Sequence, residues 1–263
     1  MATEERVATI ASEGVGESKT VPVRVVARVR PLLPFETVHS TRSCVTVLGS
    51  QTLIMGKDRA FAFDAVYSPD APQENIYNEW VSPLVDGLFH GYNATVLAYG
   101  QTGAGKTFTM GSSDNSGKRS EELGIIPRVM LDIYNRLEHL TALEKTGESS
   151  RGVCVRVSYI EIYNEEIRDL LDSGTSKTLA IREKADGSIV VAGAKQVVAA
   201  SLADMQNMLD LGSISRTVAG TLMNNQSSRS HSIFTITVHQ RLPSSRPATP
   251  FELVSAKFHL VGA

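Results

Sequence analysis

The chain has 263 residues, which is enough for one large domain or two small ones. Hydrophobic residues make up 42% of it and charged residues 21%, a composition typical of a globular protein with a substantial core. The formal net charge of −2 excludes a global field that would draw the protein to nucleic acid or to a membrane, so an anionic partner would need a local basic patch. Cys44 and Cys154 lie far apart without metal-ligand spacing, which predicts a reduced, intracellular protein.

The N-terminal residues 1–20 are polar and rich in Gly, Ser and Thr. We interpret them as a disordered lead-in to one domain over residues 21–263. They lack the apolar core of a signal peptide, and no apolar run in the chain is long enough to cross a bilayer. The sequence therefore predicts no membrane association.

The first half of the domain begins with a predicted strand over residues 22–30, where charged and branched apolar side chains alternate. Residues 44–63 contain short apolar runs broken by glycines, which predict a small hairpin. Residues 73–89 carry apolar side chains at helical spacing, and Gly91 follows where a helix stop is expected. Residues 94–99 are apolar throughout and predict a strand buried on both faces.

The second half continues this alternation of helices and strands. The expected elements are a helix over 125–137, a strand over 153–162, a short helix over 165–171, strand pieces around the Asp186-Gly187 turn between 179 and 199, a helix over 201–211 capped by Ser201, and strands over 232–242 and 252–261. Alternation without internal repeats predicts an α/β domain of three layers, with a large mixed central sheet flanked by helices.

A glycine-rich segment directly follows the apolar run at 94–99. It reads Gly100-Gln101-Thr102-Gly103-Ala104-Gly105-Lys106-Thr107, a complete phosphate-binding loop. Its glycines let backbone N–H groups face the phosphates, and the start of the next helix adds its positive dipole end. Lys106 is expected to reach the β- and γ-phosphates, and the Thr107 hydroxyl to bind Mg²⁺. A plain glycine-rich turn is the alternative, and the buried strand and helix start around the motif argue against it.

Three separated motifs together resemble those of the kinesin family. Residues 98–107 look like the kinesin version of the loop, Arg28-Val29-Arg30-Pro31 resembles the adenine-side motif, and residues 224–231 match the first-switch pattern N-x-x-S-S-R-S-H at every position. The similarity runs from about residue 23 to residue 261, and some details resemble the chromokinesin branch. The resemblance implies a P-loop NTPase fold, ATP and Mg²⁺ as ligands, and an ATP hydrolase that drives movement along microtubules.

The same resemblance assigns an adenine site. Arg28, Arg30 and Pro31 are expected to pack on one side of the base, with Phe108 on the other, where the family often has histidine. From the residues alone, Arg28 and Arg30 lie two apart on a strand and point the same way, and two solvated charges at a strand end are an equally good interpretation.

The first switch supplies the remaining candidate catalytic residues beside Lys106. Asn224 is expected to shape the loop, and Ser227 and Ser228 to contact the γ-phosphate, the Mg²⁺ shell and the attacking water. Arg229 would form half of a latch. On composition alone this segment would be a Ser-rich loop, and only the resemblance makes it a sensor of the γ-phosphate.

The end of the chain bears on activity. Residues 257–261 are expected to lead into the family's second switch, but the chain reads Val261-Gly262-Ala263 and ends. We therefore expect the C-terminal part of the fold to be missing, together with the principal microtubule-binding helix, and hydrolysis to be impaired. The favoured function is a microtubule motor in the full-length parent. The alternative is a non-motile fragment that binds nucleotide or tubulin without turnover.

Remaining contacts to acidic tubulin are expected from Arg182, Lys184 and Lys195, and from a loop with Lys118 and Arg119. Solvated surface charges are an equally good interpretation of any one of them. No nucleic-acid contact is evident, and the resemblance places the protein in the cytoplasm, on the cytoskeleton.

A different P-loop enzyme is the third functional hypothesis. The absence of an N-K-x-D motif disfavours a GTPase, and the exact first-switch match disfavours a small-molecule kinase.

Overall fold

The computed structural model describes residues 22–39, 42–111, 120–145, 152–172, 178–185, 187–221, 229–243 and 251–263. The lead-in expected over residues 1–20 lies outside these ranges. The chain divides into two compact units, Met1–Asp70 and Ala71–Ala263, which are described separately. Among the described residues, no helix has the length and apolar character needed to span a membrane.

The first unit contains two small sheets. Strand β1 (Val26–Arg28) pairs in parallel with β5 (Ala65–Tyr67), and an antiparallel sheet is formed by β2 (Val45–Leu48), β3 (Thr52–Met55) and β4 (Arg59–Ala62). The predicted hairpin at 44–63 thus has one strand more than expected, and the strand predicted over 22–30 is shorter. It ends at Arg28, before Pro31, which cannot donate a ladder hydrogen bond. A short helix, α2 (Pro34–Val38), follows.

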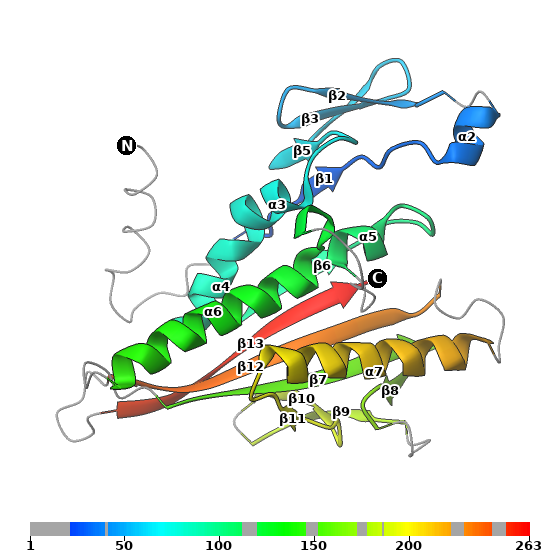
Figure 1. Cartoon of the computed structure of the whole chain (residues 1–263). Coiled ribbons are helices and arrows are strands. Elements are labelled where there is room, and N and C mark those ends of the chain that lie inside the picture. Colours follow the sequence, from blue (N-terminus) through cyan, green and yellow to red (C-terminus); the bar gives the residue numbers. More distant parts are fainter. Residues whose placement is uncertain are drawn as a thin grey trace. The chain divides into compact units, whose positions relative to one another are not determined.

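The second unit is built on a six-stranded sheet of order β11-β7-β12-β13-β6, with β8 paired to β7 (Figure 1). The strands are β6 (Ala94–Ala98), β7 (Val153–Tyr163), β8 (Glu166–Asp169), β11 (Val197–Val198), β12 (His231–Pro243) and β13 (Phe251–Gly262). Only the β13–β6 pair of this sheet is parallel, so the sheet is mixed, as predicted. Strands β9 (Ala180–Glu183) and β10 (Ile189–Ala192) form a separate hairpin around Gly187, and the expected turn residue Asp186 lies outside the described residues.

The helix predicted over residues 73–89 has three parts. They are α3 (Gln73–Ile76), a π-helical turn η1 (Tyr77–Val81) and α4 (Ser82–Phe89). Pro83 has no N–H to donate to the carbonyl of Glu79, four residues earlier, and the wider π-turn ends at Val81, two residues before the proline. Gly91 follows with φ 91°, in agreement with the expected helix stop.

Three further helices complete the unit: α5 (Lys106–Met110), α6 (Ile125–Lys145) and α7 (Leu202–Thr221), with a 3₁₀ turn η2 (Ser120–Glu122) before α6. Both α6 and α7 extend well beyond their predicted ends. The predicted cap of α7 is present as a reciprocal pair, since the Asp204 N–H donates to Ser201 Oγ (3.1 Å) and the Ser201 N–H donates to Asp204 Oδ2 (3.0 Å).

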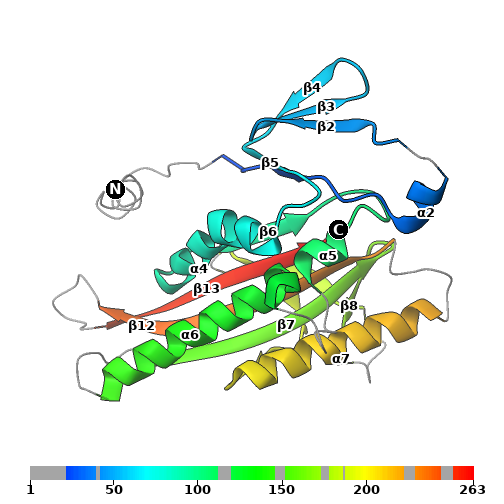
Figure 2. The ribbon, with the colours of Figure 1, turned by 45° about the horizontal axis from the view of Figure 1, so that its top comes forward.

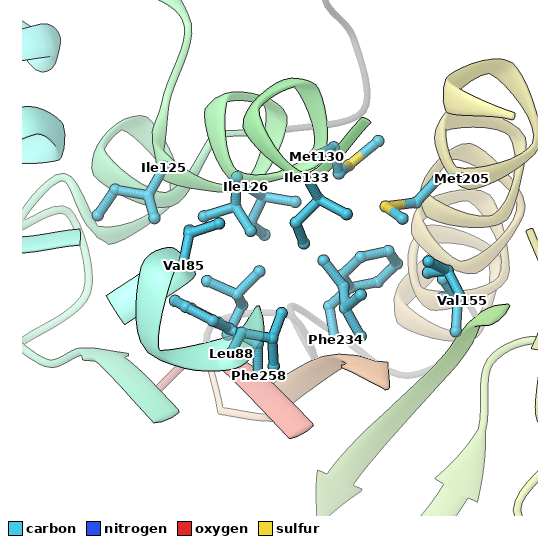
Figure 3. Packing of buried hydrophobic residues seen from close by; sticks show 14 of the residues in the cluster. Val85, Leu88, Ile125, Ile126, Met130, Ile133, Val155, Met205, Phe234 and Phe258 are labelled. Carbon is cyan, nitrogen blue, oxygen red and sulfur yellow. The ribbon is translucent and has the colours of Figure 1, made fainter. Parts of the chain in front are cut away.

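The core lies where α4, α6 and α7 run along the central strands (Figure 2). Leu88 of α4, Ile133 of α6 and Met205 of α7 point toward Phe234 and Phe258 of the sheet (Figure 3), and all five side chains are fully buried. The buried apolar side chains occupy alternate positions of both strands, namely Phe234, Ile236 and Val238 in β12 and Ala256, Phe258 and Leu260 in β13. The α/β class with a mixed central sheet flanked by helices is confirmed.

Two local predictions are wrong. Strand β6 is not buried on both faces, because Leu97 is 56% exposed and Tyr99, just after the strand, is 86% exposed. The short helix expected over 165–171 is the strand β8 instead. Asn164 and Glu165 take positive φ (49° and 64°) and form a tight turn, which folds Ile167 back to pair with Ile162 of β7.

Candidate nucleotide site

The phosphate-binding loop leaves β6 and enters α5 through three glycines with positive φ. Gly103 (φ 80°) and Gly105 (φ 95°) lie in the left-handed region that favours glycine, and Gly105 immediately precedes the helix. The Ala104 N–H donates to the Gln101 carbonyl (3.1 Å) and closes the turn. A Cβ built on Gly103 meets nothing within 4 Å, so the loop leaves open space above its backbone.

Lys106 bends back over this loop. Its Nζ donates to the carbonyls of Gly100 (2.5 Å) and Gln101 (3.1 Å), and the side chain is half-buried. Thr107 is exposed on the first turn of α5. A cationic Nζ and an exposed threonine hydroxyl beside an open backbone loop fit the phosphates and the Mg²⁺ of a nucleotide.

Helix α5 is held in place by a buried amide. Gln73 of α3 is only 4% exposed, and its Nε2 donates to the Phe108 carbonyl (2.6 Å). Gly124, just before α6, contacts the backbone of Gly111 so closely that no Cβ would fit there. These contacts fix the backbone of α5, while the side chain of Phe108 itself is exposed.

The register of the sheet brings the described end of the first-switch motif, residues 229–231, to the same edge as the loop. Ser232 at the start of β12 pairs with Gly262 of β13, and Gly262 pairs with Ala98 at the end of β6. The three residues therefore form one row across three strands. With neighbouring strands about 4.8 Å apart, the start of β12 lies about 10 Å from the strand that delivers the phosphate loop.

The described end of the first-switch motif leads into this row. Arg229 is exposed, and Ser230 is 5% exposed. Asn224, Ser227 and Ser228 lie outside the described residues, so their roles, including the Mg²⁺ contact of Ser228, stay predictions. The structure thus brings together the loop, Lys106 and Thr107 with the C-terminal end of the motif.

Two residues that the sequence did not single out contact this end of the motif. Arg216 of α7 and Glu161 of β7 form an ion pair (Nε–Oε1 3.2 Å) beside Ser230 and Ser232. A signal for Glu161 does exist in the sequence, because it occupies the same strand face as Val157 and Tyr159. A charge in an apolar series of alternate positions indicates a buried partner.

The predicted adenine residues of the N-terminal motif lie in the first unit. Arg28 ends β1, and burial lowers its pKa. Arg30 lies beyond the strand, so the expectation that both arginines share one strand is wrong. Its guanidinium binds both carboxylate oxygens of Glu36 (2.7 and 2.8 Å) and the Pro31 carbonyl (2.9 Å). Contact of these residues with adenine stays a prediction.

Comparison with known proteins identifies the family. The kinesin motor domain family model matches residues 28–262. Kinesin-like protein KIF7 of Homo sapiens is 42% identical over 251 residues, which cover 93% of this chain and 18% of that protein. Chromosome-associated kinesin KIF4 of Xenopus laevis is 41% identical over 251 residues, covering 94% of this chain and 20% of that protein. The chain therefore spans about a fifth of the length of these relatives.

The fold agrees with the sequence comparison. A solved structure of a fast kinesin aligns with a TM-score of 0.78 and 34% identity, over 91% of this chain and 64% of that one. The nearly equal identities to KIF7 and KIF4 do not separate subfamilies, so the chromokinesin branch stays a prediction. The phosphate loop, the adjoining end of the first-switch motif and the match over residues 28–262 show that the chain belongs to the kinesin motor-domain family.

Proposed function

We propose that this chain is the ATP-binding motor domain of a longer parent protein in which ATP hydrolysis drives movement along microtubules. The observation that carries the proposal is the row Ser232–Gly262–Ala98, which puts the phosphate loop and the end of the first-switch motif on one edge of one sheet. The fast kinesin that shares this fold is described as an ATPase that interacts with microtubules.

In this function the loop binds the phosphates through its backbone N–H groups. Lys106 exchanges its two loop carbonyls for β- and γ-phosphate oxygens, and Thr107 and Ser228 hold Mg²⁺. Bound Mg²⁺ would neutralise charge that develops on the phosphate oxygens. Asn224, Ser227 and Arg229 arrange the segment that contacts the γ-phosphate and orients the attacking water. Because phosphoryl transfer needs mainly positioning and charge stabilisation, no covalent role is required of any side chain.

The base would be held by packing rather than by polar readout. Phe108 has an exposed ring on α5, and Arg28, Arg30 and Pro31 are the further residues that the family resemblance assigns to the base. Glu36 pairs with Arg30 through two hydrogen bonds and restricts the conformations open to that guanidinium. A planar cation stacks well on an aromatic base.

Microtubule binding would use exposed basic residues of the second unit. Arg182 on β9 and Lys184 after it are exposed. Lys195 is also at the surface, but its Nζ donates a hydrogen bond to the Leu171 carbonyl (3.2 Å). Lys118 and Arg119 lie outside the described residues. Such a patch would give a weak, salt-dependent affinity for an acidic surface, and microtubules as partner would put the protein on the cytoskeleton in the cytoplasm.

Binding of a fluorescent ATP analogue with Mg²⁺ to the purified chain tests the nucleotide site. Lys106→Ala is expected to abolish saturable binding, because it removes the cation that faces the phosphates. Lys57→Ala, an exposed lysine on a turn of the first unit, is the matched control and should bind as the wild type does. Equal binding by Lys106→Ala would show that the loop does not hold the phosphates.

The motor assignment has its own test. Steady-state ATP hydrolysis is measured with and without microtubules at low and at higher salt. Stimulation by microtubules that declines as salt rises would support the proposal. Nucleotide binding with no stimulated turnover would contradict motor activity for this chain and leave the nucleotide site intact.

A further inference from the structure

The contact between α7 and β7 sets up a buried polar cluster. Gly212 packs on the ring of Tyr159, and Arg216 lies one helical turn later over Glu161, two residues farther along the strand. Four residues of helix rise about 6 Å. Two residues of strand rise about 6.6 Å. Because the two elements advance by almost the same distance, the close approach at Gly212 delivers Arg216 to Glu161.

Arg216 uses all three of its side-chain nitrogens in this cluster. Nε faces Glu161 Oε1 (3.2 Å) and Ser230 Oγ (3.3 Å), and Nη1 donates to Ser232 Oγ (3.1 Å). Nη2 donates to both the carbonyl and the hydroxyl of Ser230 (3.0 Å each). The guanidinium therefore joins a residue of β7 to two residues that begin β12.

The cluster lies on the row that defines the candidate nucleotide site. Glu161 pairs with Ser232, so the row runs Glu161–Ser232–Gly262–Ala98 across four strands. Glu161 is 1% exposed, and a buried carboxylate requires partners to offset its lost hydration. A buried ion pair adds little stability over well-packed apolar side chains, but it imposes a defined geometry. Here the residues whose geometry it defines are those that follow Arg229.

We propose that Arg216 and Glu161 are positioning residues that hold the C-terminal end of the N-x-x-S-S-R-S-H motif beside the phosphate loop. The inference rests on the proposed function, since it takes the motif as the part that contacts the γ-phosphate. Arg216 fixes Ser230 through its carbonyl and its hydroxyl, and Glu161 orients Arg216. Arg229, directly before Ser230, is thereby brought to the sheet edge where the phosphate loop begins.

Relative affinity for two nucleotides tests this role. Dissociation constants are measured for Mg·ADP and for a non-hydrolysable β,γ-imido ATP analogue, and the analogue-to-ADP ratio is compared between variants. The double variant Arg216→Met/Glu161→Met keeps the volume of the cluster without a buried charge. It is expected to raise the ratio about tenfold, the scale of one lost hydrogen bond to a charged group, while the ADP constant stays within twofold.

A second variant separates geometry from charge. Arg216→Lys retains a cation for Glu161 but lacks the planar guanidinium, so it cannot reproduce the separate contacts of Nη1 to Ser232 and of Nη2 to Ser230. Arg216→Lys is expected to raise the analogue-to-ADP ratio as the double variant does. If Arg216 served only to neutralise Glu161, lysine would do the same and the ratio would stay at the wild-type value. Arg156→Met, which removes an exposed arginine from the same strand, is the matched control.

The outcomes are distinct. A ratio within twofold of wild type in Arg216→Lys, or in a folded double variant, would overturn the inference. If the double variant does not fold, the lysine variant decides alone. If the wild-type chain binds neither nucleotide, the proposed function fails first, and the inference falls with it.

Discussion

Gly212 of α7 lies against the ring of Tyr159 in β7 with no room for a Cβ between them. This contact sets the distance between α7 and β7. Tyr159 in turn meets Phe234 edge-on, with ring centroids 5.3 Å apart and planes at 86°. One glycine thus controls the packing of two aromatic rings at the centre of the core.

Gly212→Ala is therefore expected to destabilise the protein by about 1–3 kcal/mol, the usual cost of overpacking a filled core. The sign of this change is informative, because at an open helix position replacing glycine by alanine stabilises a protein by about 1 kcal/mol. Gly87→Ala in α4 is the matched control, since a Cβ there would only reach ordinary contact with Tyr92 at 3.7 Å. Urea unfolding should show opposite signs for the two variants, and a stabilised Gly212→Ala would contradict the packing described.

Tyr77 of the π-helical turn hydrogen-bonds to α6. Its hydroxyl donates to Asp132 Oδ2 (2.8 Å), and burial, followed by that bond, raises the pKa of Tyr77. Tyr77→Phe removes a bond to a charged group and should lower the free energy of unfolding by about 1–3 kcal/mol. Tyr92→Phe, at an exposed ring, should change it by less than about 0.5 kcal/mol. Chemical denaturation monitored by circular dichroism measures both, and equal effects would argue against the buried bond.

The contact between Glu36 and Arg30 of the adenine motif is expected to be sensitive to acid. The hydrogen bonds from Arg30 and from the Leu33 N–H lower the pKa of Glu36 to about 2. A lowered pKa means that the folded state binds this proton less tightly than the unfolded state. Its stabilisation is therefore fully present above about pH 4.5 and is lost as the pH falls toward 2.

Carboxyl-carbon NMR titration checks this directly. Arg30→Met should move the Glu36 midpoint upward toward its ordinary value, and only partway, because the Leu33 N–H remains. An unchanged Glu36 midpoint would show that Arg30 is not its main partner.

Thr107 is predicted to carry the metal dependence of nucleotide binding. Thr107→Ala should weaken Mg·ATP-analogue binding about ten- to a hundredfold, the scale of a lost contact to a charged group. In EDTA the variant and the wild type should bind alike, because no metal contact remains to be lost. Thr141→Ala removes an exposed helical hydroxyl of α6 and serves as the control. A loss that persists in EDTA would point to damage of the loop itself.

Much of this protein could be predicted from local pattern. The phosphate loop is contiguous, so its glycines, Lys106 and Thr107 identify the site without knowledge of the fold. The long strands and the apolar faces of the helices follow from periodicity, which depends only on neighbours within a few residues. The cap of α7 was predicted correctly for the same reason, since Ser201 and Asp204 bond to each other's backbone.

Tertiary structure decided what depends on partners far away in the sequence. Residues 165–171 form a strand because Ile167 pairs with Ile162 of β7. Leu97 is exposed because no other element of the described chain buries its face of β6. Local pattern carries no information on which strand lies beside which, or in what register. The row Glu161–Ser232–Gly262–Ala98 joins residues more than 160 positions apart, and only that pairing brings the residues bound by Arg216, at the described end of the first-switch motif, to the sheet edge where the phosphate loop begins.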